Sequence, residues 1–142
     1  MRADYHLHCE FSDDSRETMD KQIERAIELK LDEICFTDHV DYGVKPDVEG
    51  ILGARVLEGA RVVNVDYDAY FPCIEALRDE WAGRISIKRG LEYGVQTHTI
   101  GQFDALWDRW GDHLDFTLLS IHQVGDAEFW TGEFQEGRTQ EE

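Results

Sequence analysis

The chain has 142 residues, of which 42% are hydrophobic, so it is long and apolar enough to form one globular domain with a buried core. Its 31 acidic and 14 basic residues give a formal net charge of −17, which disfavours nucleic-acid and membrane partners and favours cations, although such charge usually serves solubility. No apolar run approaches the roughly 20 residues that cross a bilayer, and residues 1–11 do not resemble a signal peptide, so a cytoplasmic protein is expected.

The first forty residues read as a strand, a helix and a second strand. Residues 3–8 alternate polar and apolar side chains, as strands do, and residues 10–15 form a polar loop. Thr18 can cap a helix that runs to about residue 30 and presents an apolar stripe with a 3.6-residue period. Residues 33–37 then form the second strand. Strands that alternate with helices predict an α/β fold with parallel strands.

The alternation continues after a long irregular segment. Residues 40–65 hold four glycines and one proline without a clean period, which suggests a functional loop or lid. A helix is expected from residue 66 to about 81, a strand over 84–92, a helix over 100–110 and a strand over 115–121. No internal repeat or linker interrupts the chain, so we expect a single domain over residues 1–142.

The three cysteines, Cys9, Cys35 and Cys73, are odd in number and show no C-x-x-C spacing. This argues against a disulfide framework and against a cysteine zinc site. We expect three small buried side chains in a reducing compartment.

Histidines and one glutamate stand where the predicted strands end. His6 and His8 are two apart on the first strand, so both side chains can reach one metal as neutral imidazoles, although a histidine pair on a strand is common without one. His39, Glu92 and His122 close the next three strands. Four strand ends in succession would leave costly polar groups without partners unless something binds them, which predicts a metal site.

The same segments resemble the polymerase and histidinol phosphatase (PHP) superfamily, and within it the histidinol-phosphate phosphatases. They are Asp-Tyr-His-Leu-His-Cys-Glu-Phe-Ser-Asp-Asp-Ser at 4–15, Phe-Thr-Asp-His-Val-Asp at 36–41, Gly-Leu-Glu-Tyr-Gly at 90–94 and Ser-Ile-His at 120–122. The resemblance spans essentially the whole chain. It implies the N-terminal part of a distorted (β/α)7 barrel with a site for up to three divalent metal ions at the C-terminal mouth.

The resemblance also assigns the metal ligands. It implies that His6 and His8 bind the first metal, that Glu92 bridges the first and second metals, and that His122 binds the second. It implies that His39 binds the third metal, and Asp14 stands where some relatives have a further histidine for it. Zinc, manganese and iron all suit mixed imidazole and carboxylate ligands. No side-chain nucleophile is identified, so a metal-held hydroxide is the expected nucleophile.

Other candidates have more ordinary interpretations. His98 follows Glu92 by six positions with a spacing that fits a ligand poorly, and His113 is expected to be a solvated loop residue. Asp13 and Asp38 are expected to orient ligands or form turns. The pair Trp107 and Trp110 is expected in the core.

The expected activity is hydrolysis of a small phosphate monoester, foremost histidinol phosphate in histidine biosynthesis. The alternatives are a PHP phosphoesterase for another small phosphorylated metabolite and a non-catalytic metal-binding or interaction fragment. The family's barrel is much longer, and its later strands supply an Asp-x-His pair, whereas no histidine follows His122 here. We therefore expect a fragment of a longer product, with poor activity and self-association of the open barrel, although a truncated reading frame or an exchange between chains would also fit.

Overall fold

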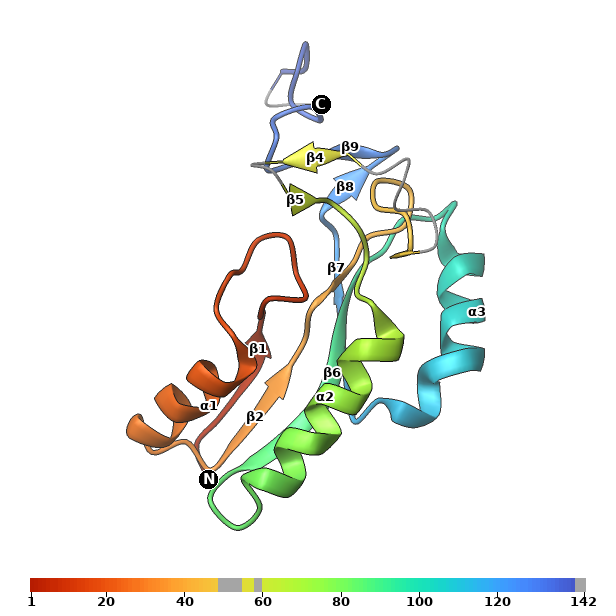
Figure 1. The fold of residues 1–142 in the computed structure, drawn as a ribbon. Coiled ribbons are helices and arrows are strands. Elements are labelled where there is room, and N and C mark those ends of the chain that lie inside the picture. The colour runs from red at the N-terminus through yellow and green to blue at the C-terminus, as the bar shows by residue number, and fades with distance from the viewer. Residues whose placement is uncertain (49–54, 58–59, 140–142) are drawn as a thin grey trace.

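The computed structural model describes residues 1–48, 55–57 and 60–139 of the chain (Figure 1). Its main sheet is built from β1 (Ala3–Leu7), β2 (Glu33–Phe36), β3 (His39–Val40), β6 (Ser86–Gly94) and β7 (Phe116–Ser120). All the pairings within this sheet are parallel. The predicted parallel α/β class is therefore confirmed.

The longest strand, β6, organises the sheet. Both β2 and β3 pair with β6 in one register, with Phe36 opposite Arg89 and His39 opposite Glu92, so they act as one strand with a short interruption. The other side of β6 pairs with β7, where Leu118 lies opposite Glu92. This register places histidine and glutamate side chains of adjacent strands at the same level.

The sheet is curled, as a partial barrel requires. Tyr5 of β1 and Phe116 of β7 belong to the two outer strands, yet their ring centroids lie only 4.9 Å apart. A flat sheet would hold these strands about 14 Å apart, since neighbouring strands are spaced by about 4.8 Å. The strands therefore form an arc, which agrees with the expected part of a (β/α) barrel.

Three helices connect the strands and cover the apolar core: α1 (Met19–Glu28), α2 (Tyr67–Glu80) and α3 (Ile100–Trp110). Figure 1 shows α2 lying over β6, with α1 beside β1 and α3 at the opposite flank. The Thr18 side chain caps α1 by accepting a hydrogen bond from the Lys21 backbone N–H, as predicted. Helices α1 and α2 bury most of the apolar stripe expected for a 3.6-residue period, whereas α3 buries Phe103 and Leu106.

Two short hairpins lie beyond the sheet. Of the long segment 40–65, the described part contains β3 and the antiparallel pair β4 (Val56–Leu57) and β5 (Ala60–Arg61), while 49–54 and 58–59 lie outside the described residues. The second hairpin joins β8 (Gln123–Val124) to β9 (Ala127–Glu128) and was not predicted. It follows the last sheet strand directly.

Two expectations about aromatic and histidine residues were wrong. Trp107 is 55% exposed, although its position in the helical stripe had placed it in the core. Trp110 does pack inward, with its ring centroid 5.2 Å from that of Phe71. His113 belongs to the 3-10 helix η2 (Gly111–His113) and not to a loop, and it is partly exposed, with its ring 5.5 Å from that of Phe71.

The cysteines were expected to be unpaired and buried, and the structure agrees except for the burial of Cys73. All three cysteines are free, Cys9 and Cys35 are buried, and Cys73 is partly exposed. Among the helices of the described residues, none has the length and apolar character to cross a membrane.

Candidate metal centre

The predicted residues converge at the carboxyl ends of the parallel strands, where this architecture places its functional sites. The pairing of β1 with β2 shifts register between Asp4 and Leu7, so the strand is irregular just where His6 and His8 leave it. The His8 side chain is 15% exposed, whereas the His6 side chain is 56% exposed and forms the rim of the cluster.

Glu92 lies at the centre of the cluster and is only 2% exposed. Its Oε2 atom is 2.9 Å from Nε2 of His6 and 2.9 Å from Nε2 of His8. Its Oε1 atom is 3.1 Å from Nε2 of His122 and accepts a hydrogen bond of 2.6 Å from the Ser120 hydroxyl. One carboxylate thus faces imidazoles from two sides, an arrangement in which it can bridge two cations.

Asp14 joins the cluster from the loop after β1. Its Oδ2 atom is 3.0 Å from Nδ1 of His8 and 3.3 Å from Nε2 of His39. His39 in turn has its Nδ1 atom 3.5 Å from Oε2 of Glu92. Every residue predicted as a metal ligand, including Asp14, is therefore within one connected group.

The ligand atoms are close enough to hold cations. Three sets have their ligand atoms within 4.8 Å of one another; they are His6–His8–Glu92, His8–Asp14–His39 and His39–Asp41–His122. Within the described residues, Nδ1 of His39 is buried without a hydrogen-bond partner and lies 3.5 Å from Oε2 of Glu92. A buried polar atom without a partner is costly, so this nitrogen fits a role as a metal ligand.

The electrostatics of the group couple protons to metal binding. Burial alone would raise the pKa of the Glu92 carboxyl, but hydrogen bonds from His122 and Ser120 and the nearby His8 hold it well below its usual range. Burial opposes protonation of His8, yet the carboxylates of Asp14 and Glu92 raise its pKa to about 10. Contact with the Asp41 and Glu92 carboxylates raises the pKa of His122 to about 9. A metal must displace these protons, so the affinity of the site for a metal should weaken as the pH is lowered.

Residues around the cluster were only partly anticipated. Asp13 binds the Lys45 ammonium, and Asp38 accepts hydrogen bonds from the backbone N–H and thiol of Cys9 at 2.8 and 3.0 Å, which suits the expected orienting and turn-forming roles. His98 contacts Asp126 at 2.9 Å and is in none of the three sets. Lys45 was not predicted to belong to the site. The signal that could have indicated it is its spacing of four residues from Asp41, with which it forms an ion pair.

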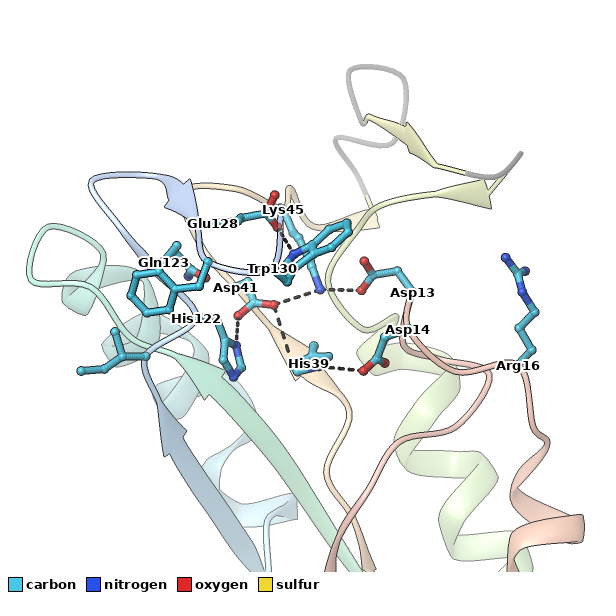
Figure 2. Close-up of a pocket in the computed structure, with 12 residues that line it drawn as sticks. Asp13, Asp14, Arg16, His39, Asp41, Lys45, His122, Gln123, Glu128 and Trp130 are labelled. Carbon is cyan, nitrogen blue, oxygen red and sulfur yellow. Dashed lines mark hydrogen bonds and ion pairs between the residues drawn. The ribbon is translucent and has the colours of Figure 1, made fainter. Parts of the chain in front are cut away.

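A cavity of about 560 Å³ opens beside the cluster. Figure 2 shows His39, Asp41 and His122 at its floor, with Asp13 and Asp14 from the loop after β1 on one side. The β8–β9 hairpin and the residues after it supply the other side. The lining residues from that part of the chain, none of them predicted, are Gln123, Glu128, Phe129 and Trp130.

Known proteins are similar to this chain in sequence. A histidinol-phosphatase of Lactococcus lactis is 32% identical over 131 residues, which are 92% of this chain and 43% of that protein. A histidinol-phosphatase of Bacillus subtilis is 25% identical over 85% of this chain and 44% of its own length. The chain thus spans less than half the length of these curated relatives.

Two solved structures are similar to this chain in fold. The crystal structure of histidinol phosphate phosphatase from Lactococcus lactis, complexed with zinc, L-histidinol and phosphate, is similar with a TM-score of 0.81 and 33% identity. The similarity covers 99% of this chain and 48% of that one. A putative histidinol phosphatase from Listeria monocytogenes shares the fold with a TM-score of 0.67 at 20% identity, over 85% of this chain and 45% of that one. The pattern of the PHP domain family matches residues 4–142, and the chain therefore belongs to that family.

Proposed function

We propose that this chain supplies the metal-binding part of a phosphoesterase active site that hydrolyses histidinol phosphate. The observation that carries the proposal is the convergence of four imidazoles on the buried Glu92, with Nδ1 of His39 left without a hydrogen-bond partner among the described residues. Imidazoles gathered around one carboxylate can bind several cations, and neighbouring cations stabilise the charge that develops during phosphoryl transfer.

The ligand roles follow the distances. His6 and His8 share Oε2 of Glu92 and would hold a first metal, while His122 faces Oε1 and would hold a second with it. His39 and Asp14 would hold a third. Zinc is the first choice because the Lactococcus lactis structure contains it, with manganese and iron as alternatives.

The metals, when bound, supply the positive charge that stabilises the phosphoryl oxygens and the leaving alkoxide. The chain's own residues prepare the site for that chemistry. Glu92 presents one oxygen to each side of the cluster, and the Ser120 hydroxyl fixes its orientation through a 2.6 Å hydrogen bond. The cavity next to His39 and His122 gives the organic part of the substrate a place to bind.

The charge of the cavity favours a cationic organic part. Its lining carries the carboxylates of Asp13, Asp14, Asp41 and Glu128 and the cations of Arg16 and Lys45. Lys45 pairs with Asp13 and Asp41, and Glu128 pairs with Arg55, so the four carboxylates still outnumber the three cations. Histidinol, which the Lactococcus lactis protein binds together with phosphate, carries an amine and an imidazole. Such a ligand suits an acidic wall better than a nucleoside monophosphate, whose sugar and base carry no positive charge.

Phosphate release from histidinol phosphate, compared with a nucleoside monophosphate, tests the proposal in the presence of zinc. The chain is assayed alone and mixed with the part of the Lactococcus lactis relative that its match leaves out. We expect zinc-dependent release that prefers histidinol phosphate in at least one of these samples. Zinc-bound protein without activity in either sample, or with a preference for the nucleotide, would contradict the proposal.

A further inference from the structure

A buried charged group lies directly behind the proposed metal ligands. Its members are Asp41, which is 3% exposed, and Lys45, which is 6% exposed. The Lys45 Nζ atom is 2.9 Å from Oδ2 of Asp41 and also binds Oδ1 of Asp13. A buried ammonium is tolerated only when it is paired, and here both carboxylates that pair with it lie beside the metal centre.

Both carboxylate oxygens and the backbone N–H of Asp41 have partners. Its Oδ1 atom is 2.7 Å from Nδ1 of His122, its Oδ2 atom contacts Lys45, and its backbone N–H donates to Oδ1 of Asn64 at 2.8 Å. The other ring nitrogen of His122, Nε2, faces Oε1 of Glu92 at 3.1 Å. Because Nδ1 donates to Asp41, Nε2 is the nitrogen left to bind a metal.

Gly94 makes room for this contact. A Cβ atom at residue 94 would lie 1.9 Å from Oδ1 of Asp41 and 2.9 Å from Nδ1 of His122. Any larger residue there would clash with the Asp41 carboxylate and crowd the His122 ring, so the contact between them would have to shift. The end of β6 is thus shaped around the pair of Asp41 and His122.

Asp41 also belongs to a set that could itself hold a metal, together with His39 and His122. The distances disfavour this, because Oδ2 of Asp41 is 3.8 Å from Nδ1 of His39 but 2.9 Å from the Lys45 ammonium. The lysine already supplies the cation at that oxygen. Its charge is shared by two carboxylates, so it is poorly placed to serve as a phosphate ligand.

We propose that Asp41 is a positioning residue and not a metal ligand, and that Lys45 holds it so that Nε2 of His122 points at the metals. This inference rests on the proposed metal centre. Carboxylates that orient a ligating histidine typically change metal affinity by about 10- to 100-fold when they are altered, without removing the ligand itself.

Zinc binding by the whole chain, measured by competition with a chromogenic chelator, separates the two roles of Asp41. Asp41→Asn and Lys45→Met are expected to keep the wild-type number of zinc ions at saturation while one of them binds about 10- to 100-fold more weakly. His122→Ala is expected to lose one zinc. Lys21→Met, on the exposed face of α1, is the matched control and should match the wild type.

Nitrogen NMR of the zinc-loaded wild-type chain gives a readout that does not depend on any variant. Nδ1 of His122 should carry a proton and Nε2 should bind zinc, and zinc on Nδ1 would overturn the inference. So would loss of a whole zinc in Asp41→Asn, or wild-type affinity in both Asp41→Asn and Lys45→Met. Full zinc content in His122→Ala would instead show that the proposed metal centre is wrong at this ligand.

Discussion

Replacing Glu92 by glutamine removes the central charge of the cluster while keeping its size and one acceptor oxygen. The wild-type carboxylate lies within 3.1 Å of nitrogens from His6, His8 and His122, so it would sit between two bound cations. Two opposite unit charges at 4 Å attract by about 4 kcal/mol at an effective dielectric constant of 20, and divalent ions attract more strongly. Since each 1.4 kcal/mol is tenfold in affinity, we expect Glu92→Gln to weaken zinc binding by about a thousandfold or more.

The assay is the zinc content and zinc affinity of Glu92→Gln after dialysis against a chelator. Glu24→Gln is the matched control, because it makes the same chemical change on the exposed face of α1. The control should bind zinc like the wild type. Equal zinc affinity in the two variants would refute the central role given to Glu92, and circular dichroism of both would show whether the fold is retained.

Three further predictions concern stability and association. In the metal-free chain the pKa of His8 is raised to about 10 and that of His122 to about 9, so their protonated forms stabilise the fold fully below the unfolded pKa near 6.5. That contribution should disappear as pH rises through about 9 to 10, and denaturation of the metal-free chain showing no decline over this range would contradict it. Leu119, which is 74% exposed on β7, should promote self-association, so Leu119→Glu should sediment as a smaller species, and identical sedimentation would argue against this surface. Gly90→Ala should lower the melting temperature, because its Cβ would lie 2.7 Å from a sulfur and 2.8 Å from a backbone oxygen of β2. Gly101→Ala, with nothing within 4 Å in α3, should be stabilised by about 0.5–1 kcal/mol, and the reverse order would refute the packing described.

The elements that build the site could be predicted because their signals are local. Strand alternation and helical periodicity located β1, α1, β2 and the later strands, and the strand ends pointed to His6, His8, His39, Glu92 and His122. Parallel pairing then brings strand ends together without further information, which is why residues far apart in sequence meet at Glu92.

What could not be predicted depends on contacts between distant segments. The pair of Asp41 and His122 is separated by 81 residues, and no local pattern distinguishes that aspartate from a turn former. The periodicity of α3 placed Trp107 on the apolar stripe but could not show that no described segment covers it. The β8–β9 hairpin lacks an alternating apolar pattern and was missed for that reason.

The residues gathered around Glu92 are expected to bind divalent metal, and elemental analysis of the purified chain after extensive dialysis measures this. We expect at least about one equivalent of transition metal per chain, or its recovery on adding zinc or manganese, because several imidazole and carboxylate ligands converge there. Protein that is folded by circular dichroism, holds well under one equivalent and regains none with either metal would show that these residues form no metal centre.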